Sequence, residues 1–343
     1  GEFLAIVTPS GQITSAYSPA YPAQFPDTSY GRDGAGNERY FRIPTPGSDN
    51  NIAENLGPLI LGVNHSPAQL DPDQPLNVSA SVAPAQNAVA AVNLVYRIDF
   101  GPEVVVPMTP GPQLDDGARS YHAEISAALY EPGSLVRYYV RAVDAVDFAA
   151  RWPIFSSPAT APQYQGTLVR DPSISSSLPI FHWFMQDIGG ASTDGGGRAT
   201  VFYDGVLYDN VFVRLRGDTT TDQPKQSFKF VFNDGYHLRL TPDGYLVDEI
   251  NVNSNVRDYS HLHQTLSWEA FRDAGTPHSL AILTRVERNG SFYGIYTMIE
   301  QPESQYFERQ ALDWQGALYK VNRNDLASHT QGVEKKTRKD EDF

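Results

Sequence analysis

Two alternating runs between residues 211 and 232 constrain the fold more than any other stretch of the chain. One set of alternate positions is apolar and consists of Val211, Val213, Leu215, Phe228, Phe230 and Phe232. The positions between them include four cations, Arg214, Arg216, Lys225 and Lys229. Because side chains alternate between the faces of a β-strand, we expect two strands with the apolar set in a core. If the strands pair, the cations share the opposite face, and Lys225 and Lys229 point the same way.

The cationic face is unusual because the chain is acidic overall, with a formal net charge of -14. Arginine offers phosphate a planar fork, and lysine offers it a point charge. A glycine beside them, here Gly217, allows backbone amides to approach an anion. The face is therefore a candidate phosphate-binding surface. The alternative is a solvated sheet face whose cations pair with nearby acids.

Length and composition favour several β-rich domains. A chain of 343 residues usually divides into two or three domains. Hydrophobic residues make up 41%, which is enough for packed cores, and 27 glycines and 25 prolines indicate many turns. The chain begins with the strand-like GEFLAIV and ends with EKKTRKDEDF, so we expect both ends to be cut from a longer protein.

Several classes of function are disfavoured. The acidic balance argues against nucleic-acid binding, which needs a basic surface. The absence of cysteine excludes disulfides, thiolate zinc sites and cysteine nucleophiles. No apolar run approaches the ~18–20 residues of a membrane span. The GxGxxG, Walker A, HExxH and GxSxG signatures are missing.

Residues 1–57 are predicted to be short, turn-rich β-structure with too little material for an independent core. They resemble the C-terminal half of a lamin-tail-type β-sandwich domain without its earlier strands. The residues that carry this resemblance are Gln24, Asp27, Ser29, Tyr30, Gly31, Thr45, Pro46, Gly47, Ser48 and Asn50. The alternative is a Pro/Gly-rich N-terminal tail.

Residues 58–168 are predicted to form one all-β sandwich, because short alternating strands are separated by turns. One such strand places Leu76, Val78, Ala80 and Val82 on one face. The phrase YEPGSLVRYYVRAVDA resembles the late strands of fibronectin-III-like or immunoglobulin-like modules. No site is evident here, which is typical of a spacer or a binding module.

Residues 169–343 are predicted to form an α+β domain with an antiparallel sheet. Hairpin turns are expected at residues 204–205, 233–235 and 289–290. A helix is expected after Asp258, which is placed to cap it. The apolar stripe of this helix consists of Leu262, Leu266 and Ala270. A second helix is expected over PESQYFERQAL.

The phrase RLRGDTTTDQPKQSFKFVF resembles the signature of the spore coat protein H (CotH) kinase-like family. Later phrases support the resemblance in the right order: DEINVNSNVRDYSHLHQTLSWEAFRDAGTP, VERNGSFYGIYTMIEQPESQYFERQ, GALYKVN and VEKKTRKDEDF. It extends from about residue 178 to the end of the chain. It implies an atypical-kinase-like domain, here truncated before its large lobe, with ATP and Mg²⁺ or Mn²⁺ as cofactors.

On that template, Lys225 or Lys229 would hold the nucleotide phosphates, with Arg216 beside them. Spacing does not choose between the two lysines, and Lys225 is favoured because it opens the strand beside the polar loop. Glu269, in the helix after Asp258, would be the acidic partner of the lysine. The alternative for Glu269 is an ordinary solvated glutamate.

The resemblance also implies a nucleotide contact at the end of a later strand. Glu300 and Gln301 close the strand YGIYTMIEQ before a helix, where a kinase hinge would contact the adenine. The alternative for Glu300 is a helix-capping acid. The metal and catalytic carboxylates of the family lie in the larger lobe, and the charged run containing Asp340 and Asp342 does not supply them. We therefore predict no metal ligand and expect this chain to be inactive by itself.

Two functions follow as hypotheses. The first is a fragment of a secreted or surface bacterial protein kinase, a transferase that phosphorylates protein side chains with ATP. The second is a non-catalytic extracellular binding, adhesion or structural protein whose sandwich modules hold a surface ligand. In the second case the kinase-like lobe is degenerate. The secreted location is inferred only from the types of domain that precede the kinase-like domain in the chain.

Overall fold

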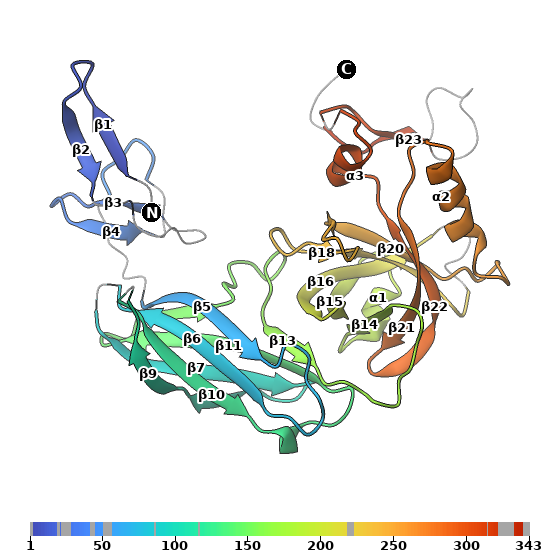
Figure 1. Cartoon of the computed structure of the whole chain (residues 1–343), viewed down its shortest axis with the longest axis horizontal. Helices are drawn as coiled ribbons and strands as arrows, with labels where there is room; N and C mark the ends of the chain where they lie inside the picture. Colours follow the sequence, from blue (N-terminus) through green and yellow to red (C-terminus); the bar gives the residue numbers. More distant parts are fainter. Residues whose placement is uncertain are drawn as a thin grey trace.

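The computed structural model describes residues 3–18, 21, 29–41, 45–50, 57–85, 87–115, 117–217, 223–313, 315–321 and 333–338. Figure 1 shows three bodies along the chain: a small N-terminal part, a β-sandwich and a β-barrel with short helices beside it. The described part is predominantly β-structure, as the composition predicts. The proposed boundaries at residues 57 and 168 stay predictions.

The N-terminal part consists of two hairpins. β1 (Leu4–Val7) pairs with β2 (Ile13–Tyr17), and β3 (Ser29–Arg32) pairs with β4 (Glu38–Phe41). The apolar side chains of β1 are largely exposed, which agrees with the expected lack of an independent core. Gln24 and Asp27 lie outside the described residues, and the lamin-tail resemblance stays a prediction.

Two sheets form the sandwich. The first has the order β5-β6-β10-β9, and the second has the order β12-β11-β7-β8 with β13 also paired to β11. The strands of the first sheet are β5 (Leu59–Ser66), β6 (Leu76–Ala83), β9 (Thr109–Gln113) and β10 (Arg119–Ile125). Those of the second are β7 (Val89–Ile98), β8 (Val104–Pro107), β11 (Leu135–Asp144), β12 (Ala149–Trp152) and β13 (Gln165–Leu168). A short 3-10 helix, η1 (Ala127–Leu129), precedes β11.

The sandwich core is built from alternate positions of these strands. The expected set on β6 is buried and consists of Leu76, Val78, Ala80 and Val82. Facing residues of the second sheet, including Leu94, Tyr138 and Val140, belong to the same cluster. The period-two pattern therefore identified the inward face of this strand correctly.

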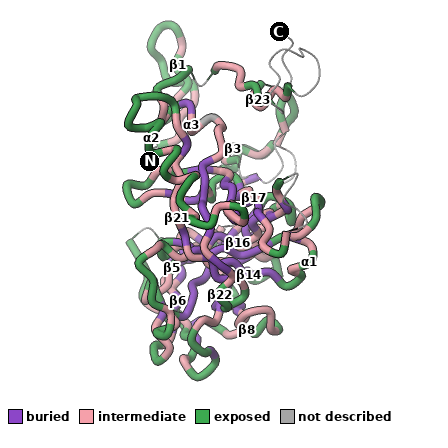
Figure 2. Tube along the Cα trace, turned by 90° about the vertical axis from the view of Figure 1, so that its right-hand side faces the viewer, coloured by how far each residue is buried: buried purple, intermediate pink, exposed green. Residues whose placement is uncertain are grey.

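The barrel is closed, in the order β14-β15-β16-β17-β20-β22-β21. Its strands are β14 (Ile180–Phe184), β15 (Gly197–Tyr203), β16 (Val206–Arg216), β17 (Ser227–Val231), β20 (Glu249–Asn253), β21 (Ala281–Arg288) and β22 (Ser291–Glu300). Neighbouring strands run antiparallel except at the closure, where β14 pairs in parallel with β21. The expected antiparallel sheet is thus correct for the other pairs, but it curls into a barrel. Figure 2 shows buried residues concentrated along these strands.

The barrel interior confirms the apolar half of the alternating pattern. The three phenylalanines Phe228, Phe230 and Phe232 join the core, with Val211 and Val213 from β16. Phe230 packs edge-on against Phe181 and Trp183, with ring centroids 5.1 and 5.5 Å away. In the register, Leu215 stands opposite Phe228 and Arg214 opposite Lys229. Arg214, Arg216 and Lys229 therefore lie on the outer face.

Two of the three expected hairpins are present. β15 and β16 turn at Asp204 and Gly205, and β21 and β22 turn at Asn289 and Gly290. All four residues have the positive φ that a two-residue hairpin needs. The hairpin expected at residues 233–235 is wrong. Both edges of β17 are taken by β16 and β20, and the following β18 (Leu238–Arg239) pairs with β19 (Leu246–Val247).

Short helices and a last hairpin accompany the barrel. They are α1 (Ile188–Ala191), α2 (His263–Asp273) and α3 (Ser304–Arg309), followed by β23 (Tyr319–Val321) paired with β24 (Val333–Lys335). Asp258 accepts the backbone N–H of His263, the first residue of α2, at 2.9 Å, although the cap position itself is Leu262. The expected packing of the α2 stripe is not found, because Leu266 is 53% exposed and no residue of α2 is buried. Within the described residues, no helix is long and apolar enough to cross a membrane.

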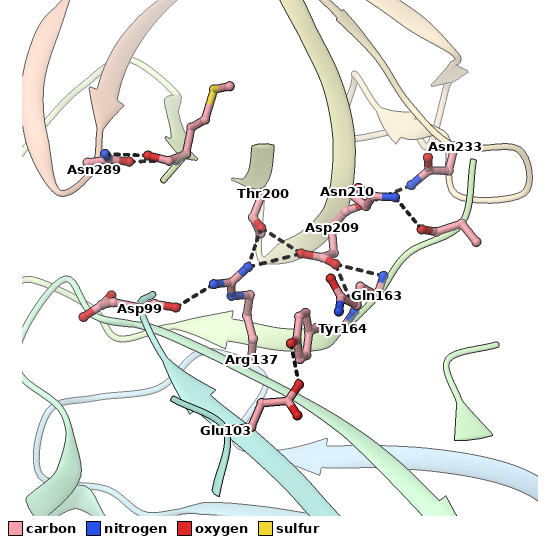
Figure 3. A network of polar contacts seen from close by, with 12 residues as sticks. Asp99, Glu103, Arg137, Gln163, Tyr164, Thr200, Asp209, Asn210, Asn233 and Asn289 are labelled. Carbon is pink, nitrogen blue, oxygen red and sulfur yellow. Dashed lines mark hydrogen bonds and ion pairs between the residues drawn. The ribbon is translucent and has the colours of Figure 1, made fainter. Parts of the chain in front are cut away.

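Sandwich and barrel meet in a buried junction. Its apolar part joins Leu135 and Leu168 of the sandwich to Phe184 and Phe202 of the barrel. Beside it, Figure 3 shows a polar network that connects β11, the segment before β13, and strands β15 and β16. The chain around Gln163 thus packs against β16 and is not a free linker.

Candidate functional site

A groove of about 640 Å³ lies against the outer face of the barrel. Its floor comes from β16, β17 and β20, and its sides come from α2 and from residues 299–302 at the end of β22. Residues 318–320 and Lys336, in and beside the last hairpin, complete the lining. The floor residues are Arg214, Arg216, Lys229, Asn251 and Asn253. Three of the four cations expected on one face therefore line a concave surface large enough for a small ligand.

Two arginines give the groove its positive character. Arg216 Nη1 donates to Asn253 Oδ1 at 2.8 Å, and Asn253 Nδ2 donates to Gln264 Oε1 on α2 at 3.0 Å. Arg214 Nη1 donates to the Leu215 carbonyl at 3.2 Å. Burial, and then the neighbouring charge of Arg214, lowers the pKa of the Arg216 guanidinium from its ordinary value. Among the described residues, neither arginine forms an ion pair with a carboxylate.

Lys229 lies between these arginines and the end of β22. Its Nζ is 2.5 Å from Glu249 Oε2, and both side chains are 19% exposed. Glu249 opens β20, the next strand of the barrel. The groove thus presents two arginines without a described acidic partner and three lysines, of which Lys229 and Lys336 each contact a carboxylate. This arrangement suits an anion, because the positive charges outnumber the acids in contact with them.

Lys225 does not line this groove. Its Nζ donates to the Ile295 carbonyl at 2.5 Å and lies 4.5 Å from the ring centroid of Tyr296, which is fully buried in the barrel core. Burial lowers the pKa of its ammonium group. The expectation that Lys225 and Lys229 point the same way is therefore wrong. Residue 225 precedes β17, and alternation holds only within a strand.

Glu269 is also outside the groove. It lies on an exposed position of α2, whereas Gln264 and Trp268 of the same helix line the groove. The carboxylate that contacts Lys229 belongs to Glu249 instead. The expected partner Glu269 is therefore not the acid in contact with Lys229. The observed contact depends on the pairing of β17 with β20, which spacing along the chain does not reveal.

Glu300 is among the residues that line the groove, where the expected nucleotide contact stays a prediction, and it also has a structural role. Its side chain is buried, and its two oxygens accept from Tyr245 Oη at 2.5 Å, the Leu280 backbone N–H at 3.0 Å and the Arg309 guanidinium. The alternative of a helix cap is wrong, because Glu303 occupies the cap position of α3. Gln301 lines the groove, and its amide oxygen accepts a hydrogen bond from Asn251.

Glu303 is a second acid near Lys229 that the sequence did not single out. Burial and the charges of Glu249 and Asp248 raise its pKa to about 7, against the opposing effect of Lys229 and Lys336. Glu249 could have been found from the sequence, since the polar positions 249, 251 and 253 alternate with buried Ile250 and Val252. Glu303 has no such signal, because it follows the last strand of the barrel.

Residues 213–342 match a family model described as CotH kinase protein. This segment is similar to the CotH kinase family. The match includes β17, β20, α2 and the whole of β22, and it contains every residue that lines the groove. It confirms the resemblance drawn from the phrase at residues 214–232, whereas the extension back to residue 178 stays a prediction.

Other comparisons add little. Among solved structures, Spo0M, the sporulation control protein from Bacillus subtilis, matches with a TM-score of 0.22 and 10% sequence identity. That match covers 57% of this chain and 73% of the other, and at such a score it carries no argument. No curated protein matches.

Proposed function

We propose that the groove binds the phosphates of ATP and serves a CotH-type protein kinase. The observation that supports this most directly is the convergence of Arg214, Arg216 and Lys229 on one groove within the segment that matches the CotH kinase family. Phosphoryl transfer is catalysed mainly by positioning and charge stabilisation. A fixed set of cations supplies both.

The groove lining offers charged groups for the phosphates of a nucleotide and apolar surface for its base. The arginines offer planar forks to phosphate oxygens, and Lys229 offers a point charge that is already oriented. Trp268, Ile299 and Pro302 provide apolar surface suited to a base. The groove volume of about 640 Å³ falls within the usual range for small-molecule sites.

The metal ion that the family implies is not matched by the described residues. Within them, no three His, Asp or Glu side chains gather to form a metal site. No step is therefore assigned to a metal here. What this chain's own residues do is hold the phosphates, keep them oriented and offset the charge that develops on them as the phosphoryl group leaves. Transfer to a protein hydroxyl, by the whole protein, is part of the proposal.

Calorimetric titration of the chain with ATP and with adenosine tests the proposal. We expect Lys229→Met and Arg216→Met each to weaken ATP binding by about tenfold, since each removes a charged hydrogen bond. Adenosine binding should change less than about twofold, because it carries no phosphate. Arg272→Met, at an exposed arginine on α2, is the matched control and should change neither.

Two results would overturn this proposal. One is a wild-type chain that does not bind ATP. The other is an ATP affinity that is indifferent to both Lys229→Met and Arg216→Met. Lys225→Met tests the second lysine directly. If this variant loses affinity for ATP but not for adenosine, the phosphate contact belongs to Lys225 instead.

A second candidate function is ligand binding by the sandwich. A hollow of about 520 Å³ lies on the outer face of the sheet containing β5, β6 and β10. Its polar lining includes Asn64, Asn77, Ser79, His122 and Glu124. Such hydrogen-bonding groups suit a polyhydroxyl ligand at a cell surface, and secretion or surface display belongs to this proposal as well as to the first. Binding to purified polysaccharides that His122→Ala abolishes would support it, and binding unchanged in that variant would remove the hollow from consideration.

A further inference from the structure

The outer face of the first sandwich sheet carries polar side chains in two rows. Ser79 of β6 stands between Asn64 of β5 and His122 of β10, and Asn77 stands opposite Glu124 in the next row. Neighbouring strands lie about 4.8 Å apart, so each row crosses the sheet at that spacing. All five residues line the hollow of about 520 Å³. The hollow is therefore an extended surface of hydrogen-bonding groups.

The polar groups of these rows are available to a ligand. Asn77, His122 and Glu124 are exposed, and within the part of the chain that the structure describes their side chains form no hydrogen bond or ion pair. An asparagine amide both donates and accepts hydrogen bonds, and so does a neutral imidazole ring. Such a surface suits the hydroxyl groups of a sugar, because each hydroxyl also donates and accepts.

The position of the hollow leaves room for a long ligand. Arg137 of β11, which meets the barrel at Asp209, lies on the outer face of the second sheet, because Val136 and Tyr138 beside it belong to the sandwich core. The hollow lies on the outer face of the first sheet and therefore on the opposite side of the sandwich from the barrel. A polymer can cross the hollow without meeting the barrel.

Glu124 gives the hollow its charge. Among the described residues that line it, Glu124 is the one Asp, Glu, Lys or Arg. The one Arg or Lys on the strands of this sheet is Arg119, five residues earlier in β10 and about 17 Å away along the strand. Residues 58–168 as a whole include ten acidic and five basic residues. The hollow should therefore attract a cation and repel an anion.

Rows that bind hydroxyls, with one unpaired carboxylate among them, suit a sugar that also carries an amine. A carboxylate and an ammonium group form a charge-assisted hydrogen bond, which is roughly twice as strong as a neutral one. An acidic sugar would place its charge against Glu124. A neutral sugar would cover the carboxylate without pairing it, and this desolvation costs free energy.

We propose that the hollow binds a polysaccharide with free primary amines, such as a polymer of glucosamine. Glu124 accepts a hydrogen bond from the ammonium group, and Asn64, Asn77, Ser79 and His122 bind the hydroxyls. This rests on the second candidate function, a polyhydroxyl ligand in the hollow, and names the class of that ligand.

Calorimetric titration of the chain with two oligosaccharides of equal length tests the proposal close to neutral pH. One consists of glucosamine and the other of N-acetylglucosamine, in which acetylation removes the charge of the amine. We expect wild type to bind the glucosamine oligosaccharide about fivefold more tightly than the acetylated one. Glu124→Gln should remove this preference and change the affinity for the acetylated oligosaccharide less than about twofold.

Two further variants separate charge from hydrogen bonding. Asn77→Ala should weaken the binding of both oligosaccharides by a similar factor, because it removes a hydrogen bond to a hydroxyl. Glu131→Gln is the matched control and should change neither affinity. Glu131 is an exposed acid of the same sandwich and lies outside the hollow.

The outcomes separate this proposal from the function on which it rests. Equal or tighter binding of the acetylated oligosaccharide by wild type would overturn the proposal and leave the second candidate function standing. A preference that survives in Glu124→Gln would also overturn it. If neither oligosaccharide binds, the proposal falls, and titration with neutral polysaccharides decides whether the second candidate function falls with it.

Two additional measurements cover the remaining cases. If a lysine oligopeptide binds as tightly as the glucosamine oligosaccharide and Asn77→Ala does not weaken it, charge alone attracts the ligand and the assignment to a sugar is overturned. If Glu124→Gln does not fold, Glu124→Asp keeps the charge but shortens the reach. That variant should reduce the preference for the glucosamine oligosaccharide to about twofold, and an undiminished preference would contradict the contact.

Discussion

Asp209 of β16 and Arg137 of β11 meet across the junction of barrel and sandwich, with 3.7 Å between Oδ1 and Nη1. Both side chains are almost fully buried, at 3% and 7% exposure. Thr200 donates to Asp209 Oδ1 at 2.7 Å, and the backbone N–H groups of Gln163 and Tyr164 donate to Oδ2, each at 2.9 Å (Figure 3). One carboxylate therefore joins a strand of each body and the segment between them.

Replacing Asp209 should destabilise the whole molecule. Asp209→Ala leaves the Arg137 guanidinium buried without its charge partner and leaves two backbone N–H groups unpaired. Removing one member of a buried ion pair typically costs about 3–5 kcal/mol. Urea unfolding followed by tryptophan fluorescence measures this loss. Asp71→Asn, at an exposed pair, should cost under about 1 kcal/mol, and an equally small loss in Asp209→Ala would contradict the structural role.

Glu300 should matter for stability. Glu300→Gln places an amide where Arg309, Tyr245 and the Leu280 N–H all donate, so we expect a loss of about 3 kcal/mol in unfolding free energy. Hydrogen exchange of α3 should quicken, because Arg309 holds that helix to the barrel. Glu334→Gln, at a more exposed pair, is the control. A stable variant with unchanged exchange in α3 would contradict this assignment.

Glu303 should make the stability of the fold depend on pH. Its pKa is raised from 4.5 to about 7 in the folded state, so the native protein holds a proton that the unfolded chain has lost between those values. The free energy of unfolding should therefore fall as pH rises from about 4.5 to about 7. The side chain is partly exposed, and screening reduces the expected change to about 1 kcal/mol. Melting temperatures of wild type and Glu303→Gln between pH 5 and pH 8 test this, and parallel curves would refute it.

The same ionisation should weaken nucleotide binding. Above pH 7 the Glu303 carboxylate adds a negative charge near Lys229 and Lys336 at the groove. ATP affinity of wild type should fall relative to Glu303→Gln by about twofold to fivefold between pH 6 and pH 8. The ratio of the two proteins cancels the titration of the nucleotide's own phosphate. A ratio that stays constant with pH would show that Glu303 does not influence the ligand.

Local patterns predicted the strands well but the contacts between them poorly. Alternation identified the inward phenylalanines of β17 and the outward Arg214, Arg216 and Lys229, because burial on one face imposes a period of two. The same reasoning failed for Lys225, which lies before the strand begins. It also could not assign Glu249 to Lys229, since that contact depends on register.

The roles of several other residues depend on side chains that are distant in the sequence. Glu300 stands at the end of a strand, where a ligand contact is plausible from sequence, yet Arg309 and Tyr245 occupy its oxygens. The junction of Arg137 and Asp209 joins residues on separate bodies, and no local pattern marks either as buried. Helix α2 shows the reverse case, because its apolar stripe is evident in sequence and yet is not packed in the described structure.

The parallel closure of the barrel bears on how the protein is made. β14 is the first strand of the barrel to leave the ribosome, but its partner β21 is more than one hundred residues further on, with Ile180 opposite Arg285. At synthesis rates of about 5–20 residues per second, roughly 5–20 seconds pass between the synthesis of β14 and that of β21. During this time Phe181 and Trp183 lack the strand that closes the barrel around them. The sandwich precedes the barrel in the chain and is complete by then. It offers this strand an apolar surface at Leu135 and Leu168, which share a buried cluster with Phe184 in the finished molecule.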